Sequence, residues 1–143
     1  MQYDPDNHVV KLCAEGMKLE GEGKNEGAKQ LFLQAWEAAT DDLEQSTAAH
    51  YVARHQESAA DKLKWDEVAL SHALKVGNED IKATYPSLYL NIAKGYEDLH
   101  EPDKARMYYK LAYSYAGALP DDGYGRMIRG GISNGLERTK QSE

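Results

Sequence analysis

The sequence predicts an all-α protein built from antiparallel helical hairpins, and three observations lead to that prediction. Ala occupies 18 positions and Leu 14, against 13 for Val, Ile and Thr together, a composition that favours helix over sheet. Apolar residues recur every three or four positions, as at Leu88, Ile92 and Tyr96. The same pattern of helix, short polar turn and helix repeats along the chain, so 143 residues are expected to form one domain spanning 1–143.

The first hairpin is predicted over residues 7–41, with helices near 7–21 and 25–41. Its first helix carries one apolar stripe, and Gly21 to Asn25 form a glycine-rich turn. The stripe of the second helix consists of Ala and Phe residues at helical spacing. The residues of the two stripes are Leu12, Gly16 and Leu19, then Ala28, Phe32, Ala35 and Ala39.

The second hairpin is predicted over residues 43–76, with helices near 43–59 and 63–76. Asp41 and Asp42 precede it, where negative charge favours a helix N-terminus. Polar residues from Asp61 to Lys64 are expected to form its turn. Matching Val68 to Ala28 makes the repeat 40 residues long, which predicts long helices or loops in this part of the chain.

The third hairpin is predicted over residues 80–117, with helices near 80–99 and 102–117. Asn78 or Asp80 is expected to cap its first helix, and Pro102 stands in the first turn of the second, where its missing N–H needs no partner. Pro86 leaves two alternatives open: the first helix begins near Tyr85, or it is kinked there.

A last helix is predicted near residues 122–138, from apolar residues four positions apart. Three glycines inside it, each costing about 1 kcal/mol relative to Ala, predict close approach to a neighbouring helix. This helix is expected to cap the exposed face of the last hairpin. Its apolar residues are Tyr124, Ile128, Ile132 and Leu136, and its glycines are Gly130, Gly131 and Gly135.

Composition excludes several functional classes. A net charge of −7 and a pI near 5.2 argue against nucleic-acid binding, which needs clustered Lys and Arg. Apolar runs are too short for a membrane span, the N-terminus has no signal-peptide pattern, and the lone Cys13 is typical of a reducing compartment, so we expect a cytoplasmic protein. No catalytic, nucleotide-binding or metal-binding motif is recognised, so we expect neither an enzyme nor a cofactor.

The hairpins resemble those of the tetratricopeptide repeat (TPR) family, which place small residues at the close crossing of two helices and an aromatic residue near the end of the second. The resemblance covers residues 88–120 best and 12–41 next. It implies an α-solenoid of three hairpins with a terminal capping helix. The residues that carry it are Ala28, Phe32 and Ala35 in the first hairpin, and Ala93, Tyr96, Ala105, Tyr109 and Ala112 in the third.

In TPR proteins the first helix of each hairpin lines a concave groove that grips extended peptides or their carboxylates. Aligning the hairpins by the resemblance implies a row formed by Arg54, Asn91 and Arg129. Arg suits bidentate contacts with carboxylate or phosphate. The alternative is that both arginines only form surface ion pairs with Glu57, Glu97 or Asp98. Candidate ligand-binding residues beside the row are His50, Ser87, Lys94, Tyr89 and Tyr124.

The resulting expectation is a non-catalytic scaffold or adaptor that binds a protein or peptide with an acidic or carboxylate end, as a monomer or a homodimer. The alternative is a small-molecule-binding protein or an enzyme that uses His50 or His55 as a general base in the groove, with Glu57 nearby. His50 and His55 lie five positions apart, which does not direct both rings to one metal ion on a helix. We therefore expect no metal site.

Overall fold

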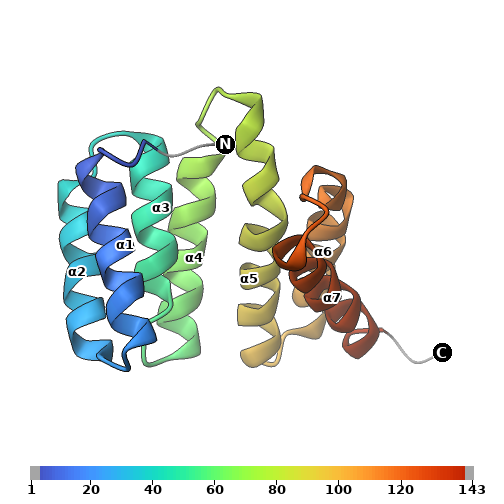
Figure 1. The fold of residues 1–143 in the computed structure, drawn as a ribbon. Coiled ribbons are helices and arrows are strands. Elements are labelled where there is room, and N and C mark those ends of the chain that lie inside the picture. Colours follow the sequence, from blue (N-terminus) through green and yellow to red (C-terminus); the bar gives the residue numbers. More distant parts are fainter. Residues whose placement is uncertain (1–3, 141–143) are drawn as a thin grey trace. The chain divides into compact units, whose positions relative to one another are not determined.

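The computed structural model describes residues 4–140, and it confirms the all-α fold class. Helices make up 78% of the structure, and no strand occurs among the residues that it describes. Within residues 8–73, and again within residues 85–138, each α-helix packs against the next one along the chain (Figure 1). Contacts divide the chain into two compact units, Met1–Val76 and Gly77–Glu143. The first ends where the second hairpin was predicted to end.

The first unit contains two helical hairpins. Three of its four helices begin with a side-chain cap: Asn7, Asp41 and Ser58 each accept a hydrogen bond from a backbone N–H of the first turn. Such caps satisfy N–H groups that have no partner within the helix. The hairpins pack together through the second and third helices (Figure 1). The helices are α1 (His8–Gly21), α2 (Asn25–Ala38), α3 (Asp42–Ala53) and α4 (Ala59–Ala73).

The crossing of α1 and α2 is closed by a glycine against an aromatic ring. Ala28 and Phe32 are fully buried, and a Cβ atom at Gly16 would overlap the Phe32 ring. Tyr51 of α3 stacks on that ring, with centroids 5.0 Å apart. This apolar contact therefore joins the first hairpin to the second.

The turn of the second hairpin differs from the prediction. Helix α3 ends at Ala53, not near residue 59, and α4 begins at Ala59, not near 63. The Ser58 hydroxyl accepts the backbone N–H of Asp61, so the segment predicted as a turn is the first turn of a helix. Ser58 was overlooked because the apolar spacing of Val52, His55 and Ala59 resembles one continuous helix.

The second unit contains the third hairpin and the terminal helix. It begins with the 3-10 helix η1 (Glu79–Thr84), which Asn78 caps. Helix α5 (Tyr85–Asp98) then begins with Pro86 in its first turn, which decides between the two alternatives at this proline: the helix begins there and is not kinked. The remaining elements are α6 (Pro102–Ser114), η2 (Ala116–Ala118) and α7 (Gly123–Arg138).

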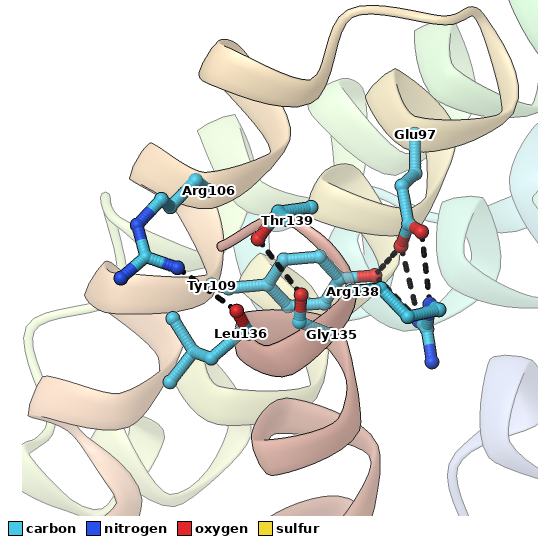
Figure 2. Close-up of polar contacts among 7 residues, drawn as sticks. All are labelled: Glu97, Arg106, Tyr109, Gly135, Leu136, Arg138 and Thr139. Carbon is cyan, nitrogen blue, oxygen red and sulfur yellow. Dashed lines mark hydrogen bonds and ion pairs between the residues drawn. The ribbon is translucent and has the colours of Figure 1, made fainter. Parts of the chain in front are cut away.

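The prediction of close approach is wrong for Gly130, where a Cβ atom would meet nothing within 4 Å, while a Cβ atom at Gly131 would lie 3.1 Å from Leu90. Helix α7 approaches α6 closely through glycine, as predicted, at Gly135. A Cβ atom at that position would overlap the Tyr109 ring, which is fully buried. The Tyr109 hydroxyl donates to Glu97, and Glu97 also pairs with the guanidinium of Arg138 through Nε at 2.8 Å and Nη2 at 3.0 Å (Figure 2). Arg106 donates to the Leu136 carbonyl at 2.9 Å. These contacts fix the end of α7 on the third hairpin.

One register relates the three hairpins. Each hairpin has three equivalent residues: one in its first helix, and two in its second helix that lie 12 and 16 positions later in the sequence. The first and second hairpins are 34 residues apart, so the predicted spacing of 40 is wrong. The second and third are 43 apart, because the end of α4 and η1 are inserted. The three sets are Gly16, Ala28 and Phe32; His50, Lys62 and Asp66; and Ala93, Ala105 and Tyr109.

Candidate functional site

The second hairpin carries three ionisable residues at the positions where its neighbours have small residues and an aromatic ring. Lys62 and Asp66 lie one turn apart on α4, and the Lys62 ammonium donates to Asp66 Oδ2 at 2.7 Å. The Asp66 side chain is only 3% exposed, and burial raises its pKa. An apolar contact in the first hairpin is thus replaced by a shielded ion pair in the second.

His50 on α3 is the first of these three residues. Its Nδ1 atom is buried and has no hydrogen-bond partner, the only such side-chain atom among residues 4–140 that are not exposed. Its ring packs edge-on against Tyr51, with centroids 5.1 Å apart. Burial lowers the pKa of His50 to about 4, and the charges of Arg54 and Lys62 add to the effect. The imidazole is therefore neutral at pH 7, and its buried Nδ1 atom has no partner.

Arg54 lies at the C-terminal end of α3, where its guanidinium meets groups from two helices. Its Nη2 pairs with Glu20 Oε1 of α1 at 3.1 Å, and its charge lies over the Tyr51 ring, 5.4 Å from the centroid. The Arg54 side chain remains 45% exposed. Glu20 uses one oxygen here and a guanidinium carries five N–H donors, so Arg54 has N–H groups that this pair does not use.

His55 follows Arg54 and binds the other oxygen of the same carboxylate. Its Nε2 lies 2.7 Å from Glu20 Oε2, and its ring packs 5.5 Å from that of Phe32. Both contacts join the two hairpins of the first unit. Glu20, not the predicted Glu57, is thus the carboxylate that His55 contacts.

The other predicted site residues belong to the second unit, and three of them make contacts within it. The Arg129 guanidinium donates to the carbonyls of Ala116, Leu119 and Pro120 at 3.1–3.3 Å, which ties α7 to the segment before it. The Ser87 hydroxyl donates to Thr84 O at 3.1 Å.

Tyr89 is the third predicted site residue that makes contacts within the second unit, and it belongs to a chain of stacked rings between α5 and α6. It stacks on Tyr115 with centroids 5.8 Å apart and on Tyr108 at 6.2 Å, and burial raises its pKa. Tyr108 stacks in turn on Tyr96 at 5.4 Å. This packing accounts for much of the excess of tyrosine in the second half of the sequence.

The remaining predicted residues are more open. Asn91 is half-buried, Tyr124 is 45% exposed, and Lys94 is exposed close enough for its charge to help lower the pKa of Glu97. Asn91 and Arg129 are each the seventh residue of their helices, whereas Arg54 follows the last residue of α3. Arg54 is therefore not equivalent to the other two, and the predicted alignment of these three residues is wrong.

The structure thus brings together two predicted residues, His50 and Arg54, and adds two that sequence reasoning missed, Lys62 and Asp66. We call these four residues the α3–α4 polar cluster. The 34-residue spacing from Gly16, Ala28 and Phe32 would have revealed the missed pair, because it places charged residues where a small and an aromatic residue are expected.

Cys13, the other group with reactive chemistry, is buried on α1. Burial raises the pKa of its thiol to about 11, which keeps it protonated and unreactive at neutral pH. Within residues 4–140, no three His, Cys, Asp or Glu side chains are arranged to hold a metal ion. None of the helices in that range is both long and apolar enough to cross a bilayer.

Comparison with known proteins adds no relative: neither the family models, nor the curated proteins, nor the solved structures include a match to this chain.

Proposed function

We propose that this protein is a non-catalytic, TPR-like binding module of the cytoplasm, which holds a peptide or protein tail through an anionic group. The observation that carries the proposal is the buried Nδ1 of His50, which lacks a partner beside Arg54 and Lys62. A buried polar atom without a hydrogen bond costs roughly 1–3 kcal/mol, so it marks a place where a ligand or ordered water completes the structure. The two cations favour an anion there.

The exposure of the two cations supports binding at this cluster. The side chains of Arg54 and Lys62 are 45% and 36% exposed, and each has N–H groups beyond those used by its acidic partner. A carboxylate at the end of a peptide can therefore accept hydrogen bonds from them. A peptide contributes further contacts along the helices of the hairpin, as expected for a scaffold or adaptor.

Calorimetric titration with a panel of peptides tests this function. The panel contains peptides with acidic C-terminal sequences, each with a free and an amidated C-terminus. We expect the free carboxylate forms to bind better, and Arg54→Ala to cost about 1.5–3 kcal/mol of binding free energy, as is usual for hydrogen bonds between charged groups. Arg126→Ala, which removes an exposed arginine of α7, is the matched control and should leave affinity unchanged. Absence of binding across the panel would contradict the proposal.

A further inference from the structure

The charges of the α3–α4 polar cluster and its ion-pair partner balance only while His50 is neutral. Arg54 pairs with Glu20 of α1, and Lys62 pairs with Asp66 on α4, so the two cations are matched by two carboxylates. The His55 ring shares the Glu20 carboxylate and adds no charge to this count while it is neutral. His50 lies on α3 four residues before Arg54, at the register position of Gly16, and its buried Nδ1 has no hydrogen-bond partner. Adding one proton to the imidazole therefore leaves the cluster with a single uncompensated positive charge.

We propose that the α3–α4 polar cluster is a proton-coupled anion site, in which a singly charged oxyanion binds together with one proton that His50 takes up. This proposal rests on the proposed function and specifies how the same site is regulated. On binding, Nδ1 of the imidazolium donates a hydrogen bond to the anion, while Arg54 and Lys62 contribute charge and keep their carboxylate partners. The proton comes from solvent, and no covalent bond changes.

Charge matching selects the class of ligand. A monoanion such as a carboxylate neutralises the one positive charge that protonation creates. A dianion such as sulfate leaves a net negative charge in a cluster that contains Asp66, whose side chain is shielded from solvent and cannot disperse the charge into water. The shared chemistry of the ligand is therefore one singly charged carboxylate, whether free or at the end of a peptide.

Coupling to a proton makes the site sensitive to pH. In the absence of ligand, burial and the two neighbouring cations hold the pKa of His50 at about 4, so the imidazole is neutral at physiological pH. A bound anion favours the imidazolium and raises that pKa. Affinity should therefore increase as pH falls below the raised pKa, by up to about tenfold for each pH unit, until the free form is protonated as well, near pH 4.

Nuclear magnetic resonance of the full chain tests the coupling directly. The imidazole Cε1–Hε1 signal of His50 is followed from pH 5.5 to 7.5 without addition, with sodium acetate and with sodium sulfate, which is a dianion throughout this range. We expect the neutral signal throughout in the free protein and a shift toward imidazolium in acetate at the acid end. The exposed His100 is the internal control, and acetate should leave its signal unchanged.

Three variants connect the signal to the cluster. His50→Asn keeps a neutral N–H donor near the position of Nδ1. Acetate should therefore bind more weakly to this variant, and its affinity should no longer depend on pH. Lys62→Gln should weaken acetate binding at least about fivefold, whereas Lys64→Gln, an exposed lysine on the same helix, should leave it unchanged. Calorimetry of acetate binding in two buffers with different protonation enthalpies should show uptake of about one proton by the unmodified chain and none by His50→Asn.

Three results would overturn the inference: a His50 signal that acetate leaves unchanged, acetate binding without proton uptake, or a larger response to sulfate than to acetate. The peptide titrations separate this failure from that of the proposed function. Peptides that bind while acetate leaves His50 neutral would leave the binding module in place without proton coupling. A His50 signal that responds to acetate without any peptide binding would retain the anion site and reject the module.

Discussion

The first and second hairpins have the same register, 34 residues apart, but close their helix crossings by different means. In the first, Gly16 lets the Phe32 ring pack directly against α1. In the second, the equivalent positions hold His50 and Asp66, and an ion pair with Lys62 replaces the ring contact. Shielded ionisable groups contribute less to stability than apolar packing of similar volume. The comparison indicates that apolar packing in the first hairpin stabilises the fold, whereas the second hairpin carries ionisable groups at the equivalent positions.

The largest effect that sharpens this comparison is expected at Phe32. Phe32→Ala leaves a cavity against Gly16 and removes the stack on Tyr51, and we expect it to reduce the free energy of unfolding by about 3–5 kcal/mol. The equivalent change in the second hairpin, Asp66→Ala, should cost much less, because burial already disfavours the carboxylate there. Urea denaturation measures both. Equal losses would remove the distinction between the hairpins.

The next largest effect concerns acid. In the unfolded chain His50 binds its proton near pH 6.5, whereas in the folded chain its pKa is about 4. The unfolded state thus binds more protons between these values, so stability is complete above about pH 6.5 and falls as the pH drops toward 4, by about 3 kcal/mol in total. Urea denaturation at several pH values should show this loss, and His50→Leu should reduce it. An unchanged slope in that variant would assign the acid sensitivity to other residues.

Glycines of α7 extend the comparison to the second unit, where a close contact again depends on a missing side chain. Gly135→Ala introduces a methyl group that overlaps the Tyr109 ring and should destabilise by about 1–3 kcal/mol. Gly130→Ala is the matched control on the same helix, because a Cβ atom there meets nothing within 4 Å. It should stabilise by about 0.5–1 kcal/mol through helix propensity alone. Thermal unfolding of the two variants should therefore shift in opposite directions.

The smallest effects are expected at two equivalent turns. Lys24 N–H donates to Leu19 O after α1, and Glu101 N–H donates to Tyr96 O after α5, each at 2.9 Å. The residue before each donor has positive φ: 76° at Gly23 and 61° at His100. Substitutions at Gly23 and at His100 should shift the midpoint of urea denaturation in opposite directions. Gly23→Ala should lose about 1 kcal/mol, and His100→Gly should gain about 0.5–1 kcal/mol, because only glycine adopts this conformation without strain.

Helical spacing and turn chemistry predicted most of the fold. The seven helices follow from local signals, such as the caps at Asp41 and Asp122 and the proline at the start of α6. The turn of the second hairpin was predicted at the wrong residues because its register positions are charged. The apolar Val68 was therefore matched to Ala28. Apolar periodicity does not locate the register at positions where ionisable residues replace apolar ones.

The candidate site was predicted only in part, for a related reason. His50 and Arg54 were candidates because their side chains carry recognisable chemistry. Lys62 and Asp66 resemble an ordinary surface pair four residues apart, and the sequence gives no sign that Asp66 is shielded. The carbonyl contacts of Arg129 depend on the path of the chain between α6 and α7, which helical periodicity does not describe.

The most direct test of the central claim converts the second hairpin to the apolar pattern of its neighbours. The triple variant His50→Ala/Lys62→Ala/Asp66→Phe is compared with the unmodified chain by urea denaturation at pH 7 and pH 5. The account predicts that the variant is at least as stable at pH 7 and loses less stability at pH 5. A variant that is less stable at pH 7 and keeps the full loss at pH 5 would contradict the claim that these residues replace packing with proton-sensitive chemistry.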